Sequence, residues 1–429
     1  MFNKYIYILG EKIRNPSLKK IFVFLKKSEY WSLKELEEYQ LKKLKELLNI
    51  AYNHSDYYKK KFDDYKLNIR TIKSLEDVKH IPTTSKQDLI DFTPQIHNNL
   101  KFKKTFLATT SGTSGESLKF YRDEHADSFN RAVIQRGYSW YGVKPWDRNG
   151  YFWGVNFSYL QQQKNKILDI LQNRFRIFSY QEKSLKKFVK KSRKARYIHG
   201  YSSMIYQTAV LINKLNLERP KRIKMVKGTS EKIFDNYQKE VKKAFGLKMI
   251  SEYGATESGI IAFECNEGKM HINMEGVLVE NINNEIIVTN LQMQSFPVIR
   301  YKLGDYIRLA SRDEKCKCGK SHLILEEVTG RIGESVYGYK DKYPSLYFYY
   351  IFKNISKKYN IDLNYQVIQD KKGELVFLIE KKLTTSIKGK LQKEIKNYFK
   401  EDVNFKVKEQ ASFRYSKGKL KNFISNLDE

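Results

Sequence analysis

The chain has 429 residues, of which 41% are hydrophobic and 14% aromatic, so it can build more than one core and is not a wholly disordered protein. Its 80 Lys and Arg residues outnumber 48 Asp and Glu residues, which gives a net charge of +32. Because the lysines are spread along the whole chain and no zinc-finger, RRM or helix-turn-helix pattern is present, we expect solvated basic faces and no nucleic-acid partner.

No apolar run is long enough to cross a bilayer, and the first residues lack the layout of a signal peptide. We therefore expect a cytoplasmic protein. The basic composition leaves open a peripheral contact with anionic phospholipid on the inner face of a membrane.

Residues 1–60 predict one or two amphipathic helices that lie on the main body, because leucines recur there at helical spacing from Leu33 to Leu48. An element on a membrane surface is the alternative. Its aromatic and apolar residues among the lysines would be Phe2, Tyr5, Ile6, Tyr7, Phe22 and Phe24.

From about residue 80 to 310, short apolar runs alternate with amphipathic stretches, as in α/β domains. The predicted helices cover 182–194, 201–215 and 231–245. The predicted strands cover 151–155, 223–226 and 249–250, followed by antiparallel strands at 285–289, 298–301 and 305–309.

A domain boundary is predicted near Gly330. The pattern divides the chain into a large α/β domain, residues 1–330, and a small α+β domain, residues 331–429. In the small domain we expect helices at 344–358 and 386–400 and strands at 363–369, 374–380 and 403–409.

Residues 109–119, Thr-Thr-Ser-Gly-Thr-Ser-Gly-Glu-Ser-Leu-Lys, predict a loop that wraps a polyphosphate. Glycine lets the backbone N–H groups point inward, and Ser and Thr hydroxyls donate to phosphate oxygens. The spacing is not that of a Walker A site. A flexible surface turn is the alternative reading of such a run taken alone.

Four motifs follow this loop in order: Ser251-Glu-Tyr-Gly-Ala-Thr-Glu257, Arg300-Tyr-Lys-Leu-Gly-Asp305, Thr329-Gly-Arg331 and Ser416-Lys-Gly-Lys419. The series resembles the adenylate-forming superfamily of acyl-CoA synthetases, luciferases and peptide-synthetase adenylation domains. Within it, Ile81-Pro-Thr-Thr-Ser-Lys86 and His199-Gly-Tyr-Ser-Ser203 resemble the phenylacetate–CoA ligase branch, which includes capsular-polysaccharide biosynthesis proteins.

The resemblance implies ATP- and Mg²⁺-dependent activation of a carboxylic acid as an acyl adenylate, then transfer to coenzyme A. It implies that the β- and γ-phosphates bind Ser111, Gly112, Thr113, Ser114 and Gly115. It implies an adenine contact by Tyr253, ATP or AMP binding by Gly254, an α-phosphate contact by Thr256, Mg²⁺ ligation by Glu257 and ribose binding by Asp305. It also implies that Arg331 contacts the ribose or phosphates at the hinge and that Lys419 is catalytic. Catalysis of this kind is mostly positioning and neutralisation of charge.

Structural roles compete with these. Asp305 could cap a turn, and Glu257 could be a charge at a helix N-terminus. The chain also departs from the usual pattern, with Ser117 where proline is common and Gly333 or Glu334 as the pivot. The catalytic lysine could equally be Lys417 or Lys421.

The candidate acid pocket consists of Trp153, His199, Gly200 and Tyr201, named from position and chemistry. His199 could instead be a hydrogen-bonded packing residue.

All three cysteines fall into two clusters, Cys265 with His271 and Cys316-Lys-Cys318. Three thiolates and one imidazole make a full tetrahedral set for a structural Zn²⁺. His322 competes with His271 as the fourth ligand. Three free thiols are the alternative.

Two other functions stay open at this point. One keeps the adenylation but transfers the acyl group to an amine, for example on a surface glycan. The other is a non-catalytic scaffold at a membrane-bound polysaccharide assembly. The sequence decides neither the acid nor the oligomeric state.

Overall fold

The computed structural model describes residues 2–110, 117–152, 159–177, 182–331, 335–361, 363–380 and 382–410, and after these residues 413, 415–416, 419–420 and 422–427. In these ranges no helix is long and apolar enough to cross a membrane.

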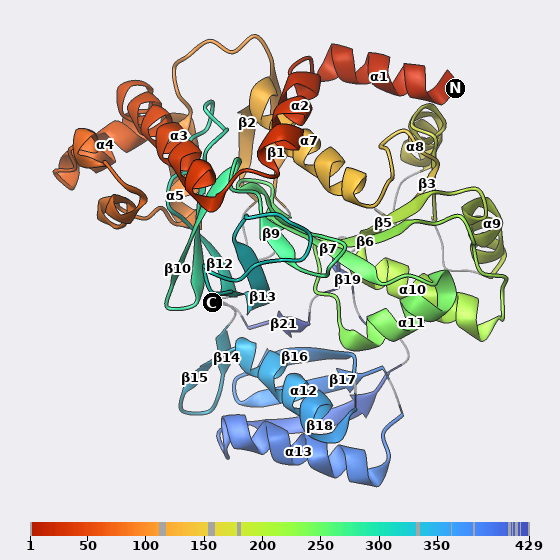
Figure 1. The fold of residues 1–429 in the computed structure, drawn as a ribbon. Coiled ribbons are helices and arrows are strands. Elements are labelled where there is room, and N and C mark those ends of the chain that lie inside the picture. Colours follow the sequence, from red (N-terminus) through yellow and green to blue (C-terminus); the bar gives the residue numbers. More distant parts are fainter. Residues whose placement is uncertain are drawn as a thin grey trace.

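Four helices, not the expected one or two, form the first part of the chain: α1 (Phe2–Arg14), α2 (Leu18–Ser28), α3 (Leu33–His54) and α4 (Asp56–Asp64). Pro16 follows α1 and cannot continue a helix. Ser32 and Ser55 each accept a backbone N–H as N-caps and so start new helices. As expected, the helices lie on the body: α2 packs along α7 (Glu124–Trp140) (Figure 1).

Short elements lead from these helices to the main sheet. They are two 3₁₀ helices (Ile69–Thr71 and Leu75–His80), α5 (Lys86–Asp91), α6 (Thr93–Ile96) and the antiparallel hairpin of β1 (Thr105–Thr109) and β2 (Lys119–Asp123).

An eleven-stranded sheet forms the centre of the molecule, in the order β10-β11-β12-β13-β9-β8-β7-β6-β5-β3-β4. Neighbouring strands from β4 to β7 run parallel, and those from β7 to β10 run antiparallel. The strands are β3 (Asn149–Phe152), β4 (Arg174–Arg176), β5 (Tyr197–Tyr201), β6 (Met225–Thr229), β7 (Met249–Ala255), β8 (Gly259–Glu264), β9 (Met270–Ile272), β10 (Val277–Ile282), β11 (Glu285–Asn290), β12 (Tyr301–Leu309) and β13 (Ile324–Arg331).

The parallel half of the sheet is flanked by α8 (Tyr159–Leu171), α9 (Glu182–Ser192), α10 (Ser202–Lys214) and α11 (Asp235–Phe245). Two predictions here were wrong in detail. Helix α11 begins at Asp235 instead of residue 231, after Ser230 takes a positive φ of 65° that ends β6 in a turn. Of the strands expected at 298–301 and 305–309, residues 298–300 form no strand, and β12 runs from Tyr301 through Gly304 to Leu309.

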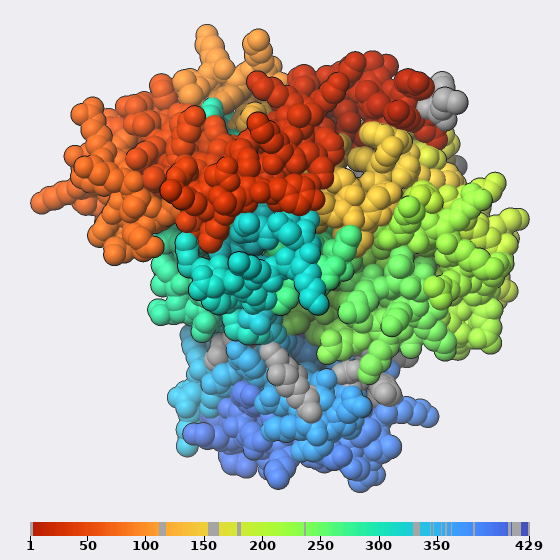
Figure 2. Space-filling view, viewed as in Figure 1, coloured from red at the N-terminus to blue at the C-terminus, as the bar shows by residue number. Residues whose placement is uncertain are grey.

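The chain after Arg331 forms its own four-stranded sheet, β18-β17-β16-β21, with a separate hydrophobic core. Figure 2 shows the described residues of this part, in blue, as a lobe below the rest of the molecule. Its elements are β14 (Ser335–Tyr337), β15 (Lys342–Pro344), α12 (Leu346–Tyr359), β16 (Tyr365–Lys371), β17 (Glu374–Ile379), α13 (Thr385–Phe399), β18 (Asn404–Glu409), β19 (Tyr415–Ser416), β20 (Lys419–Leu420) and β21 (Phe423–Ser425). The predicted fold class, a large α/β part with a smaller α+β part, is confirmed.

Candidate active site

A cavity of about 1380 Å³ lies where the carboxyl ends of the parallel strands meet the small lobe. Residues of β5, β6, β7, β12 and β13 line it, and α12 of the small lobe closes part of it. Ligands of α/β proteins commonly bind at this edge of the sheet. The cavity is therefore the candidate site, and most of the described motif residues face it.

Tyr253 and Asp305 lie 52 positions apart in the chain but touch in the cavity. Tyr253 stands near the end of β7, and Asp305 lies in the middle of β12. The Tyr253 hydroxyl donates to Asp305 Oδ2 at 2.6 Å. An ionised carboxylate has about four lone-pair sites, so this contact is compatible with further hydrogen bonds from a ribose.

A second hydrogen bond joins the same two motifs. Tyr301, next to Arg300 at the start of β12, donates its hydroxyl to Glu257 Oε1 at 2.9 Å. Glu257 is buried, with an exposed fraction of 6%, and it lines the cavity. Thr84, from the Ile81–Lys86 motif, pairs its backbone with Tyr301 on the other side. Three motifs thus meet at one strand.

Gly254 and Thr256 lie between these two contacts, and both line the cavity. A Cβ on Gly254 would come within 2.4 Å of the Gly259 carbonyl oxygen on the paired strand β8. Only glycine permits this approach of two backbones. The glycine therefore keeps the turn from Tyr253 to Glu257 tight.

The predicted phosphate loop falls largely outside the described residues: Ser111, Gly112, Thr113, Ser114 and Gly115 cannot be placed. Its two ends are described. Thr109 and Thr110 line the cavity, and the Thr110 and Leu118 backbones are hydrogen-bonded at 2.9 Å. The loop thus connects the two strands of the β1–β2 hairpin and starts at the cavity.

The motifs of the small lobe are described only in part. Arg331 ends β13 with its backbone opposite Asp305. Lys419 starts β20, where it pairs with Ser416. The structure describes only the backbone of Arg331 and Lys419. Lys417, Lys421, Gly333 and Glu334 lie outside the described residues. The choice among the three lysines stays open.

His199, Gly200 and Tyr201 line the cavity on β5, while Trp153 lies outside the described residues. The His199 ring is held between Tyr138 Oη at 3.3 Å and Asn149 Oδ1 at 3.2 Å. Burial, aided by the charges of Lys227 and Arg174, lowers the pKa of His199 well below its ordinary value, so the imidazole is neutral. Gly200 has φ +138°, and a Cβ there would meet the Phe152 carbonyl oxygen at 2.1 Å.

Sequence reasoning missed a buried ion pair in the wall of this cavity. Lys227 Nζ lies 2.6 Å from Glu252 Oε2, and the two side chains are only 3% and 6% exposed. Thr229 donates to the other oxygen of Glu252 at 3.1 Å. A lysine in the middle of a buried parallel strand was the available signal, because such strands are usually apolar.

The four predicted metal ligands Cys265, His271, Cys316 and Cys318 come together, and their ligand atoms all lie within 4.8 Å of one another. Cys265 Sγ is 3.7 Å from Cys316 Sγ, and Cys318 Sγ is 3.2 Å from His271 Nε2. A tetrahedral zinc site with Zn–S bonds of about 2.3 Å separates its sulfurs by roughly 3.8 Å. The donor set and its spacing therefore fit Zn²⁺.

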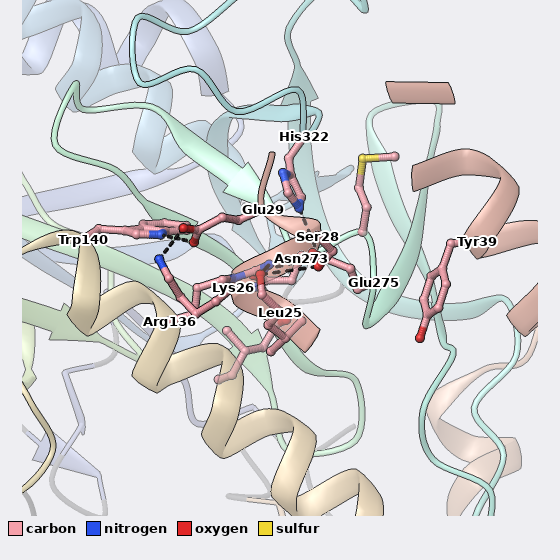
Figure 3. Close-up of polar contacts among 12 residues, drawn as sticks. Leu25, Lys26, Ser28, Glu29, Tyr39, Arg136, Trp140, Asn273, Glu275 and His322 are labelled. Carbon is pink, nitrogen blue, oxygen red and sulfur yellow. Dashed lines mark hydrogen bonds and ion pairs between the residues drawn. The ribbon is translucent and has the colours of Figure 1, made fainter. Parts of the chain in front are cut away.

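Hydrogen bonds distinguish the two candidate histidines. His271 Nδ1 lies 3.2 Å from the His322 carbonyl oxygen, which can only accept, so Nδ1 carries the proton and Nε2 offers its lone pair to the cluster. His322 turns away, and its Nε2 lies 3.1 Å from Glu275 Oε2. Figure 3 shows His322 pointing to Glu275, which also binds the guanidinium of Arg136.

No family model matches the chain. Among curated proteins, "Protein CapK" of Staphylococcus aureus is 25% identical over 291 residues, 64% of this chain and 63% of that protein, so the match spans less than two thirds of its length. Among solved structures, 2-hydroxyisobutyryl-CoA ligase in its postadenylation state, with R3-HIB-AMP, superposes with a TM-score of 0.70 and 14% identity over 93% of this chain and 91% of that one. An open conformation of the same ligase, with 2-HIB-AMP and CoA, gives a TM-score of 0.60 with 15% identity over 94% of this chain and 93% of the ligase.

At these identities the structural likeness establishes the fold. The chain has the fold of the adenylate-forming CoA ligases, as its motifs implied.

Proposed function

We propose that the chain activates a carboxylic acid with Mg-ATP, forming an acyl adenylate and pyrophosphate. The observation that carries this proposal is the pair of hydrogen bonds that joins Tyr253 to Asp305 and Tyr301 to Glu257 in the wall of one cavity. Two motifs distant in the sequence thereby form one site, as an ATP-binding role requires. The adenylate-forming fold supports the same reaction.

In this reaction a carboxylate oxygen attacks the α-phosphorus of ATP, the bond to the β-phosphate oxygen breaks, and pyrophosphate leaves. The attack brings two anions together, so the chain has to position and neutralise them. Glu257, buried and held by Tyr301, is a suitable ligand for Mg²⁺, a hard cation that prefers oxygen. Asp305 would bind the ribose, Tyr253 the adenine and Thr256 the α-phosphate.

The small lobe would contribute Lys419 and the hinge at Arg331, and it would reorient between the two half-reactions. The chain superposes better on the ligase in its postadenylation state, with a TM-score of 0.70, than on the same ligase in its thioesterification state, with 0.59. This difference supports an arrangement close to the one that follows adenylation.

The acceptor that we favour is coenzyme A, because the solved ligase with which the chain shares its fold over 94% of its length was captured with 2-HIB-AMP and CoA. An amine on a glycan or small molecule is the second candidate. A role in surface polysaccharide assembly stays a proposal, which the partial similarity to CapK supports. Turnover with and without coenzyme A, followed by mass spectrometry of the acyl product, distinguishes a thioester from an amide.

Two substitutions test the site without knowledge of the acid. Asp305→Asn removes the charge proposed to hold the ribose, and we expect ATP to bind about 10- to 100-fold more weakly by calorimetry, as for the loss of a hydrogen bond to a charged group. Asp64→Asn, an exposed carboxylate on α4, is the control. Glu257→Gln keeps an acceptor for Tyr301 but should abolish the dependence of ATP binding on Mg²⁺. Unchanged ATP binding in Asp305→Asn would refute the assignment.

We also propose one structural Zn²⁺, held by Cys265, His271, Cys316 and Cys318. A site closed by four protein ligands leaves no open position for catalysis. The ion would fasten the turn after β8 to the loop between β12 and β13, behind the strands that carry Glu257 and Asp305.

Peripheral contact with an anionic membrane is supported by two adjoining helices, α1 and α8. Tyr5, Leu9 and Ile13 form a stripe on α1 that is 60–68% exposed. On α8 apolar side chains face outward, where a surface helix usually has polar ones: Ile167 and Ile170 are 62% and 72% exposed. Among the described side chains of α8, from residue 163 on, the buried one is Asp169, which binds Arg174 and Arg176.

The charges next to α8 favour phospholipid as the occupant of this apolar surface. Lys191 on α9 is close enough to Lys187, Arg148 and Lys166 that burial and these like charges lower its pKa. A second copy of this chain, with net charge +32, would be repelled. We expect flotation with vesicles that contain phosphatidylserine but not with phosphatidylcholine alone. Replacing Ile167 and Ile170 with Asp should abolish it, while Ile282→Asp, an exposed isoleucine on β10, should not.

A further inference from the structure

The central strands β5 and β6 have an unusual composition for parallel strands. Successive side chains of a strand point to opposite faces, and a parallel sheet covered on both faces is usually apolar throughout. The sequences are Tyr-Ile-His-Gly-Tyr in β5 and Met-Val-Lys-Gly-Thr in β6. Ile198 and Val226 point to the face covered by α9, α10 and α11, where they belong to an apolar core.

The strand register aligns the polar side chains on the opposite face. Tyr151 pairs with His199, and His199 pairs with Lys227. Two residues further along, Tyr201 pairs with Thr229, and Thr229 pairs with Glu252. These six residues form a polar band, Tyr151, His199, Tyr201, Lys227, Thr229 and Glu252, and all of them line the cavity.

Tyrosines stand opposite and beside the band. Tyr138 of α7 faces it, with its hydroxyl 3.3 Å from His199 Nδ1 and its ring 5.4 Å from Lys227 Nζ. Burial raises the pKa of Tyr138 well above its ordinary value, so the phenol keeps its proton. Tyr7 of α1 and Tyr197 of β5 also line this part of the cavity. The walls thus present hydroxyls, an ammonium and a carboxylate.

A polar wall of this kind discriminates between acids by the chemistry of their chains. Lys227 gives one of its three N–H donors to Glu252, and each Glu252 oxygen accepts one hydrogen bond, so both groups keep capacity to bond to water or to a ligand in the cavity. An aliphatic or aryl chain would displace such water without replacing its hydrogen bonds, which costs roughly 1–3 kcal/mol for each group left unsatisfied. A chain that carries hydroxyls both donates and accepts, so it replaces the water at little cost. The same cavity holds Thr256 and Glu257, where the carboxylate end of the acid would have to lie.

We infer that the acid is a hydroxylated carboxylic acid of the sugar-acid type, whose hydroxyls bind the polar band, and not an aliphatic or aryl acid. This inference rests on the proposed acid activation and adds its substrate class.

Pyrophosphate release with matched pairs of acids tests the inference. Gluconate is compared with hexanoate, and quinate with cyclohexanecarboxylate, at equal Mg-ATP. We expect a kcat/KM at least tenfold higher for the hydroxylated member of each pair, because sites built to hydrogen-bond a hydroxyl reject analogues that lack it. Equal rates, or a preference for the apolar members, would overturn the inference.

A conservative substitution tests whether the polar band binds the hydroxyls of the acid. Thr229→Val removes one hydroxyl of the polar band at nearly constant volume, and we expect a several-fold lower kcat/KM for the hydroxylated acid with no loss for the apolar one. Thr208→Val is the control: its hydroxyl is buried on α10, has no partner among the described residues and does not line the cavity. An equal loss of kcat/KM for the hydroxylated acid in both variants would contradict the binding of its hydroxyls by Thr229 of β6.

Calorimetry of the same acids in the presence of AMP separates the two proposals. Tighter binding of the hydroxylated acids without pyrophosphate release would contradict the acid activation and support the pocket chemistry. Pyrophosphate release with apolar acids alone would support the activation and refute the substrate class. Failure of the hydroxylated acids to bind would likewise refute the substrate class.

Discussion

At the scale of single residues, Asp127 fixes how the first helix sits on the body. It lies on α7 with an exposed fraction of 3%, and it accepts hydrogen bonds from Asn15 at 2.9 Å, Arg122 at 2.7 Å and Arg131 at 2.8 Å. Burial alone would raise the pKa of this carboxyl, but the two arginines outweigh it and lower the pKa to about 2. The ionised form is therefore the one that the fold stabilises.

This depressed pKa predicts how stability depends on pH. Asp127 adds stability above its unfolded pKa of about 4, and the contribution is lost as the pH falls toward its folded pKa of about 2. Asp127→Asn should lower the free energy of unfolding by about 2 kcal/mol at pH 7 and progressively less below pH 4. Urea unfolding at several pH values measures this, with Asp64→Asn as the exposed control. A loss that is the same at every pH would contradict the ionic account.

Site residues that belong to a sequence motif could be predicted, whereas contacts that depend on strand register could not. Glu257 and Asp305 could be selected as site residues from the order of the motifs. In the structure Glu257 is hydrogen-bonded to Tyr301, and Asp305 is hydrogen-bonded to Tyr253. Lys227 stands out in its strand, but its partner Glu252 could not be predicted, because the pairing depends on the register between β6 and β7. The roles of Arg331 and Lys419 stay predictions.

At the scale of elements, the Cys/His cluster ties three segments together: the turn after β8, the strand β9 and the loop before β13. Strand β9 has only three residues, so the cluster adds a direct link between this turn and the loop before β13. We predict one zinc per chain by metal analysis. Its removal by a chelator should lower the Tm by several degrees, since 1 kcal/mol corresponds to about 2–4 °C in a domain of this size class.

His322 provides the control for the metal site. Cys316→Ser and His271→Gln should each lose the metal, whereas His322→Gln should keep it, because His322 binds Glu275 instead. Loss of zinc in His322→Gln with retention in His271→Gln would reverse the assignment. Protein that carries no zinc while all three thiols titrate freely would remove the site.

The elements themselves were largely predictable where periodicity is strong. In the small lobe the predicted helix at 386–400 is α13, Thr385–Phe399, and the predicted strand at 374–380 is β17, Glu374–Ile379. The helices before residue 64 were undercounted, because their breaks depend on Pro16 and on two serine caps within one continuous amphipathic pattern.

At the scale of the whole molecule, the described contacts between the large part and the small lobe include polar ones. Tyr349 of α12 donates to Glu327 of β13, and Lys232 lies 3.4 Å above the centre of the Tyr349 ring. Tyr206 of α10 donates to Glu380 at 3.3 Å. Contacts of this kind exchange easily with water, which suits the proposed reorientation of the lobe between half-reactions.

The most direct test of the proposed activation is acid-dependent exchange of labelled pyrophosphate into ATP. The exchange reports formation and reversal of the acyl adenylate without an acceptor. We predict exchange that requires both Mg²⁺ and a hydroxylated acid, and that falls at least tenfold in Asp305→Asn. Absence of exchange with every acid, in protein that binds Mg-ATP, would contradict acid activation at this site.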